Sequence, residues 1–142
     1  MVNRVFMENK IIKATNQRPV SNHIIDASIV NIDILTFIKQ IKNETAWKEN
    51  DRNAITVFKT NGLSIVLIAL HQNAEMTKHK TNELMSIQML EGEIEFSTND
   101  ESFSLKDGQM IAAHSRLEHS ILALQESVFL LTVTTSTKQF ID

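Results

Sequence analysis

The sequence predicts an all-β domain, an antiparallel sandwich or barrel, with one short helix before it. From residue 54 onward, short apolar segments are separated by turns at even spacing, which is typical of these architectures. The three glycines of this 142-residue chain, Gly62, Gly92 and Gly108, each fall between two such segments. The length favours one domain, and a hydrophobic fraction of 42% is enough for a packed core.

Residues 1–30 are predicted to form an N-terminal arm, ahead of a domain that spans residues 31–142. Three apolar pairs in the arm could be short strands that dock on the domain, and the arm could equally be loose. These pairs are Ile11-Ile12, Ile24-Ile25 and Ile29-Val30.

A helix is predicted over residues 33–43. Either Asn31 or Asp33 can cap its start by accepting a hydrogen bond from a free backbone N–H group. Because the helix is short, it needs an apolar surface to pack on. Its own apolar stripe is formed by Ile34, Leu35, Ile38 and Ile41.

The rest of the chain is predicted to form about eight strands. Asn61-Gly62 is a strong hairpin signal, because both residues tolerate positive φ angles. Trp47, between the helix and the first of these strands, is expected to close one end of the barrel or an interface. The predicted strands are Ala54–Lys59, Leu63–Leu70, Leu84–Leu90, Glu93–Ser97, Ser102–Leu105, Gln109–Ala113, His119–Leu124 and Ser127–Thr135.

Composition excludes several classes of function. A net charge of −3 gives no reason to expect nucleic-acid binding, and the absence of cysteine excludes disulfides, thiolate metal sites and a cysteine nucleophile. The longest apolar run, Ile65–Leu70, is too short to span a bilayer. We therefore expect a cytoplasmic protein with no membrane or nucleic-acid partner.

Two segments resemble the two sequence motifs of the cupins. In the first, His79 takes the first histidine position and Gly92 the closing glycine. In the second, Gly108 and His119 stand at the separation that the motif requires. The two segments are residues 73–96 and 108–123.

The likeness extends over roughly residues 54–135 and is closest to small stand-alone bacterial cupins of undefined function. It implies a cupin double-stranded β-helix, which is a jelly roll of two antiparallel sheets, and it implies a homodimer. Residues 1–30 could supply a strand exchanged between the two copies, which would also cover a sheet edge. The likeness rests on Arg52-Asn53-Ala54, LSIVLIALH, MSIQMLEGEIEF and SVFLLTV.

The motifs are degenerate at the metal-binding positions. Cupin metal centres use three histidines and one glutamate, but Thr81 stands at the second histidine position and Met85 at the glutamate position. Two of the four ligand positions, His79 and His119, keep a metal-binding side chain. We expect no cofactor. The alternative is a divalent transition metal on His79 and His119, with a further ligand such as Glu83. Further departures from the motifs occur at Asn73, His114, Arg116 and Ala123.

A pocket is predicted where these positions meet. If Met85 replaces the glutamate, it points into the barrel, and side-chain alternation puts Ile87 on the same face and Ile121 beside His119. The alternative is that these side chains simply fill the core. The predicted pocket residues are His79, Thr81, Met85, Ile87, His119 and Ile121.

Two classes of function follow, and whether the protein is an enzyme stays open. The first is a small-molecule-binding barrel with an apolar pocket, two histidines and no complete metal site. The second is a metal-dependent cupin enzyme, such as a dioxygenase or an isomerase, that uses His79 and His119 with an atypical ligand set. The loss of two ligand positions favours the first.

Overall fold

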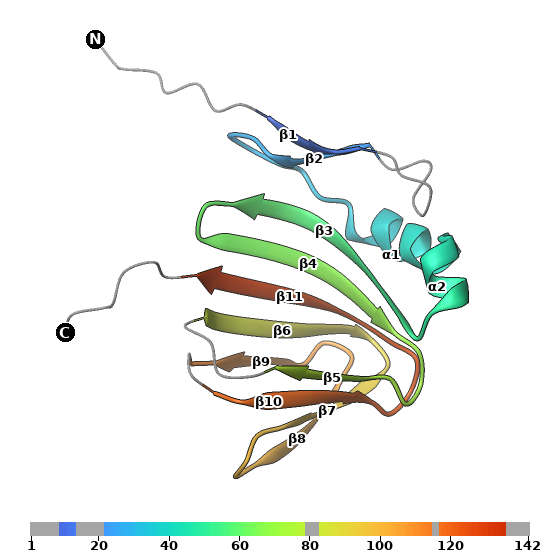
Figure 1. Ribbon diagram of the computed structural model, residues 1–142, viewed down its shortest axis with the longest axis vertical. Coiled ribbons are helices and arrows are strands. Elements are labelled where there is room, and N and C mark those ends of the chain that lie inside the picture. Colours follow the sequence, from blue (N-terminus) through green and yellow to red (C-terminus); the bar gives the residue numbers. More distant parts are fainter. Residues whose placement is uncertain (1–8, 14–21, 79–82, 115–116, 136–142) are drawn as a thin grey trace, which may run out of the picture.

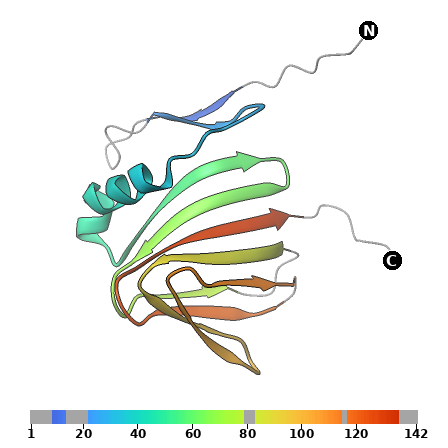
Figure 2. The same ribbon diagram turned by 180° about the vertical axis from the view of Figure 1, so that it is seen from behind.

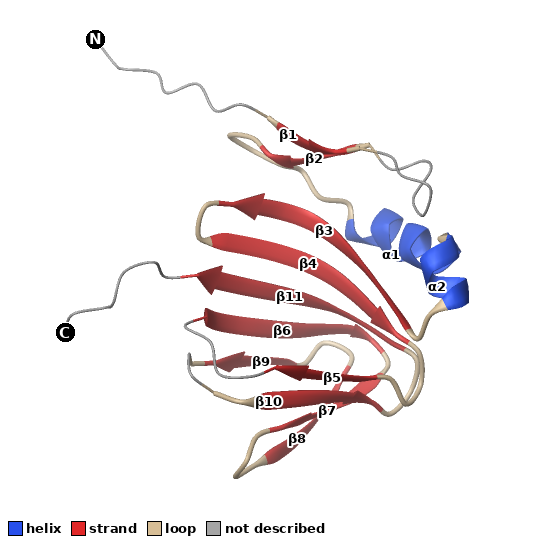
Figure 3. Ribbon diagram, in the orientation of Figure 1, coloured by secondary structure: helices blue, strands red, loops and turns tan. Residues whose placement is uncertain are grey.

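The computed structural model describes residues 9–13, 22–78, 83–114 and 117–135. Two antiparallel sheets face each other, and the helices and a small third sheet lie beside the larger of them (Figures 1 and 3). The predicted all-β jelly roll of two antiparallel sheets is confirmed, although the described residues form two short helices rather than one.

The elements follow one another along the chain in the order shown in Figure 1. They are β1 (Lys10–Ile12), β2 (His23–Asp26), α1 (Ile34–Asn43), α2 (Thr45–Glu49), β3 (Arg52–Thr60), β4 (Leu63–Leu70), β5 (Glu75–Lys78), β6 (Glu83–Glu91), β7 (Glu93–Ser97), β8 (Ser102–Lys106), β9 (Met110–Ala113), β10 (His119–Ala123) and β11 (Ser127–Thr135).

Most neighbouring strands within each sheet are distant in the sequence. The larger sheet has the order β3-β4-β11-β6-β9, and the smaller has the order β5-β10-β7-β8. All three glycines lie at the predicted turns and have positive φ angles, of 87° at Gly62, 89° at Gly92 and 81° at Gly108. These turns therefore use the conformation that glycine adopts without strain.

Strand β4 of the larger sheet is covered on both faces, which explains its unbroken apolar run Ile65–Leu70. Ile68 and Leu70 point into the space between the two sheets and belong to the barrel core. Leu67 and Ala69 point the other way, into a second cluster formed with the helices. A strand covered on both faces has no need of polar residues at alternate positions.

Helix α1 supplies the cover on the outer face. It begins one residue after Asp33, which is the N-cap and accepts a hydrogen bond from the Thr36 backbone N–H at 3.3 Å. Ile38 and Ile41 are buried as predicted, but Leu35 is 73% exposed. Phe37 joins the cluster instead, because three residues place it only about 60° around the helix from Ile34, whereas Leu35 lies about 100° from Ile34 on the other side. Neither described helix is long and apolar enough to cross a membrane.

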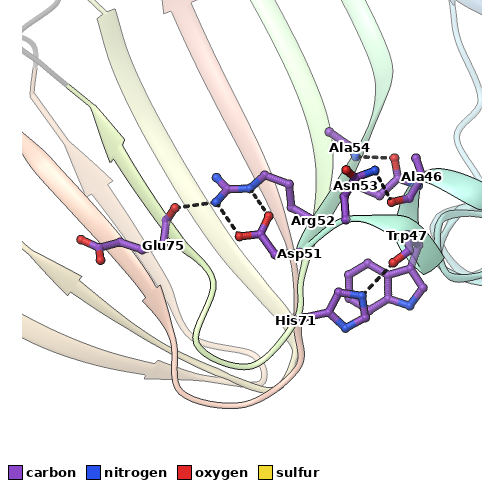
Figure 4. Close-up of polar contacts among 9 residues, drawn as sticks. Ala46, Trp47, Asp51, Arg52, Asn53, Ala54, His71 and Glu75 are labelled. Atoms are coloured by element: carbon purple, nitrogen blue, oxygen red, sulfur yellow. Dashed lines mark hydrogen bonds and ion pairs between the residues drawn. The ribbon is translucent and has the colours of Figure 1, made fainter.

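Asn53 joins α1 and the short helix α2 to the start of β3. Its side-chain amide, which is buried, donates hydrogen bonds to the Ile41 carbonyl at 3.0 Å and to Glu44 Oε1 at 2.9 Å. Its Oδ1 accepts the Ala54 N–H at 2.9 Å (Figure 4). One side chain thus satisfies the carbonyl at the end of one helix and the carboxylate before the next.

Trp47 lies in the outer cluster rather than inside the barrel. Its ring is stacked on His71, with ring centroids 3.4 Å apart, and His71 Nε2 lies 2.9 Å from the Trp47 carbonyl oxygen (Figure 4). Nearby, Arg52 binds Asp51 and donates a hydrogen bond to the Glu75 carbonyl at 2.7 Å. These contacts hold α2, β3 and the segment before β5 together at one end of the barrel.

The arm contains two of the three proposed strands. β1 and β2 pair with each other, and β2 lies beside β3, where His23 Nε2 is 2.7 Å from the Thr56 carbonyl oxygen. The pair Ile29-Val30 is not in a strand. Seen from behind, the β1–β2 pair follows the edge of the larger sheet at β3 (Figure 2).

Candidate ligand-binding pocket

A pocket of about 120 Å³ lies between the two sheets, at the end of the barrel where β5 ends and β6 and β10 begin. This is the left end of the barrel in Figure 1. Apolar side chains make up most of its wall, and two imidazoles and a carboxylate are added to them. The lining residues are Met76, Thr77, Glu83, Met85, His114, Leu117, His119, Ile121, Leu131 and Val133.

Strand register brings the apolar wall together from four strands. Met85 of β6 is paired with Val133 of β11, and both side chains face into the barrel. On the opposite sheet, Ile121 of β10 is paired with Met76 of β5. Since directly paired residues share a face of the sheet, each pair adds one patch to the same cavity.

His119 is the imidazole whose surroundings are best defined. It is the first residue of β10 and is half-buried. Its ring stacks on Phe96 with centroids 5.2 Å apart and an angle of 18° between the planes. Its Nδ1 lies 3.3 Å from the Leu117 carbonyl oxygen. The ring is therefore held between the barrel core and the pocket.

Glu83 and His114 add further polar atoms to the pocket wall. Glu83 lies two residues before Met85 on β6, so alternation places both on the same face, as the sequence suggested. His71 lies elsewhere, stacked on Trp47. The pocket can thus offer a ligand both hydrogen bonds and apolar contact.

The structure brings together three of the predicted pocket residues, Met85, His119 and Ile121. Ile87 is fully buried in the barrel core, below the pocket wall. His79 and Thr81 lie outside the described residues.

Four apolar residues of the pocket wall were not predicted from the sequence. They are Met76, Leu117, Leu131 and Val133. The segment that became β5 was not predicted to be a strand. In β11, Leu130 and Leu131 are both apolar because both faces of the sheet are covered, so the sequence did not show which of them faces the barrel.

Comparison with known proteins identifies the architecture. No protein-family model matches the sequence. No curated protein matches it either. Among solved structures, a cupin superfamily protein from Desulfitobacterium hafniense superposes with a TM-score of 0.59 and 14% sequence identity, over 62% of this chain and 81% of that one. The chain has the cupin fold.

Other structures with this cupin fold differ in what is known of them. A conserved protein of unknown function from Streptococcus pyogenes is 22% identical, with a TM-score of 0.58 over 63% of this chain and 80% of the other. Ectoine synthase from P. lautus is 17% identical, with a TM-score of 0.52 over 59% of this chain and 64% of that one. Likeness at this level establishes the fold and leaves the activity to be argued from the pocket.

The described residues do not fit a complete cupin metal centre. Catalytic metal sites use three or more protein ligands. Within the parts of the chain that the structure describes, no group of three or more histidines and carboxylates is arranged to hold a metal ion. At the glutamate position of the motif, Met85 offers a thioether, which is a poor ligand for the hard and borderline cations that carboxylates bind.

Proposed function

We propose that the barrel pocket binds a small, partly apolar molecule without a complete metal centre. The observation that carries this proposal is the open volume of about 120 Å³ beside Met85, His119 and Ile121. Protein interiors are close-packed, and space left empty among apolar side chains lowers stability. A barrel that served only to fold would be expected to fill this space.

The chemistry of the wall supports a ligand with one polar end. Apolar side chains from β5, β6, β10 and β11 would contact its apolar part, and His119, His114 and Glu83 would accept or donate hydrogen bonds at its polar end. Ligand sites commonly combine a mostly apolar wall with a few polar groups that fix orientation.

The proposal predicts that small fragments bind to the metal-free protein. Saturation-transfer NMR with a fragment library, in the presence of a chelator, should find binders of the wild-type protein. Leu131→Phe should weaken that binding at least about tenfold, because the longer phenyl ring at Leu131 projects into this small pocket and takes space from the ligand.

Leu130→Phe is the matched control for this experiment. It makes the same change at the next residue of β11, but Leu130 packs on the outer face against the helices. Fragment binding should survive in this variant. Equal loss of binding in both variants, or no binder of the wild-type protein, would contradict the proposal.

A metal-dependent enzyme is the second candidate, and one observation favours it. Glu83, His114 and His119 all line the same pocket, so the residue types of a metal site occur there although their arrangement does not form one. The cupin fold also serves enzymes, of which ectoine synthase is an example.

Metal analysis separates the two candidates. Protein purified without a chelator or a histidine tag should contain far less than one equivalent of any transition metal. One equivalent of metal that is lost in His79→Ala or His119→Ala, and retained in His71→Ala, would overturn the metal-free proposal. His71 is a suitable control because its ring is stacked on Trp47, away from the pocket.

A further inference from the structure

A second, larger hollow lies beside the pocket, between strands β8 and β9. Its volume is about 610 Å³, which is in the range of sites that hold whole small molecules. We call this hollow the side groove. Its lining includes Phe96 and Ile111 on the floor, Phe103 on the β8 side, and Met110 on the β9 side.

The side groove exists because the barrel is not closed at this side. β8 is the last strand of the smaller sheet and β9 the last strand of the larger one, and the two are not hydrogen-bonded to each other. In Figure 1, β8 diverges from β9 towards the lower edge of the molecule. The groove therefore opens from solvent towards the apolar side chains of the barrel interior.

Large apolar side chains at the groove stay exposed to solvent. Phe103, Met110 and Leu117 are 43%, 58% and 40% exposed. Single exposed apolar residues need no explanation, but apolar residues gathered around one hollow are a feature of ligand-binding grooves. The apolar rim indicates that the groove receives an apolar group.

The side groove and the pocket are adjacent, because His114 and Leu117 line both of them. The pocket alone is small: its volume of about 120 Å³ is below the roughly 150 Å³ of an apolar cavity that holds benzene. The part of a larger molecule that does not fit in the pocket can lie beyond His114 and Leu117, in the groove.

The described side chains of the two linings offer an anionic ligand no lysine or arginine. Among the described lining residues, the charged side chains are Glu83 and Glu101, and none is a lysine or arginine. An anionic group bound there would lose hydration without gaining a cationic partner.

We propose that the natural ligand is an elongated, uncharged amphipathic molecule, with its polar end in the pocket beside His114 and His119 and its alkyl or aryl tail in the side groove. This inference rests on the proposed function, since the pocket is the first of its two compartments. It adds the shape, the charge and the second compartment of the ligand.

Methionine methyl groups report on each compartment separately. Met85 and Met76 line the pocket, Met110 lines the groove, and Met89 is buried in the core as an internal reference. With these methyl groups labelled with carbon-13, the protein would be titrated with the straight-chain alcohols 1-butanol and 1-octanol. Both alcohols should shift the Met85 resonance, and only 1-octanol should shift that of Met110.

The two alcohols should also differ in their affinity for the protein. Each methylene removed from water strengthens binding by up to about fourfold, so 1-octanol should bind at least about tenfold more tightly than 1-butanol. Phe103→Glu, which charges the groove but not the pocket, should remove most of this advantage and leave 1-butanol binding unchanged. Leu35→Glu is the matched control, because it places the same charge at an apolar side chain on α1 that is 73% exposed.

The outcomes distinguish this inference from the proposed function. If 1-butanol shifts Met85 but 1-octanol binds no more tightly and leaves Met110 unmoved, the side groove is not part of the site and the inference fails alone. If Met110 shifts without Met85, the hollows act separately and the inference again fails. If neither alcohol shifts Met85, both the inference and the proposed function fail. Octanoate binding as tightly as 1-octanol would overturn the uncharged character of the ligand.

Discussion

Gly92 is the residue whose lack of a side chain is most tightly required. Its φ angle is 89°, and a Cβ atom there would lie 2.3 Å from the Glu126 carbonyl oxygen and 2.6 Å from Ser127 Oγ. Ser127 is itself buried and accepts the Glu93 N–H at 3.1 Å, so it has little room to move. The β6–β7 and β10–β11 turns thus meet at a point that only glycine fits.

Gly92→Ala should lower the free energy of unfolding by about 2 to 5 kcal/mol, from backbone strain and overpacking together. Gly108→Ala is the control: its φ angle is 81°, but no atom lies within 4 Å of the added Cβ. Gly108→Ala should lower the free energy of unfolding through backbone strain alone, by about 1 to 2 kcal/mol. Unfolding in guanidinium measures the free energy of unfolding of both variants. An equal loss of stability in the two would show that the contact with Glu126 and Ser127 does not matter.

Two departures from the cupin motif have different structural consequences. Asn73 stands at the position of the opening glycine and keeps a φ angle of 74°, a conformation that asparagine tolerates better than most residues. The backbone of the motif is therefore retained. Met85 keeps the inward direction of the residue that it replaces but changes the chemistry of the pocket wall.

At the scale of elements, the start of α1 offers a test that depends on pH. The Thr36 hydroxyl and backbone N–H donate to the two carboxylate oxygens of Asp33, at 2.7 and 3.3 Å. These two hydrogen bonds, in that order of importance, lower the pKa of Asp33 below its ordinary value of 3.8. The capping stabilisation is complete above pH 3.8 and is lost as the pH falls through the lower pKa of the folded state.

Asp33→Ala should therefore shift the guanidinium midpoint to a lower concentration at pH 7, and the difference from the wild-type protein should shrink as the pH falls below 3.8. Asn31→Ala is the control, since Asn31 was the alternative cap in the sequence and the structure assigns the cap to Asp33. A difference for Asp33→Ala that is constant with pH would contradict the role of the carboxylate.

The elements that the sequence predicted are those with strong local signals. Positive-φ turn residues marked the ends of six strands, and one apolar stripe marked α1. β5 was missed because Glu75–Lys78 has one large apolar residue, Met76, and its pairing with β10 bridges about forty residues of sequence. α2 was missed because five residues are too few to show helical periodicity.

The candidate pocket was predictable only where the motif fixed a position. Met85, His119 and Ile121 followed from the cupin spacing and from strand alternation. The part of the wall contributed by Met76 and Val133 depends on which strands become neighbours in space, and no local pattern encodes that. The side groove depends on the gap between two sheet edges, which is a property of the whole fold.

At the scale of the whole molecule, an exposed apolar face remains on the arm. Ile11 and Ile24 are paired across β1 and β2, so they share a face, and they are 53% and 42% exposed. We predict that a second copy of the chain covers this face in a homodimer.

Size-exclusion chromatography with light scattering should give the mass of two chains. Ile24→Asp should shift the protein towards the monomer, because it places a charge in the interface, whereas Ser28→Asp, at an exposed polar position, should leave the dimer intact. A monomer at all concentrations would contradict the prediction.

The central claim is that the space between the sheets at Met85, His119 and Ile121 is a ligand site that needs no metal. A crystal structure of chelator-treated protein, soaked with the best fragment from the screen, tests it most directly. The account predicts fragment density in contact with these three residues, with the polar end of the fragment near the His119 ring. Side chains that fill the space completely, with the fragment bound elsewhere on the protein, would contradict it.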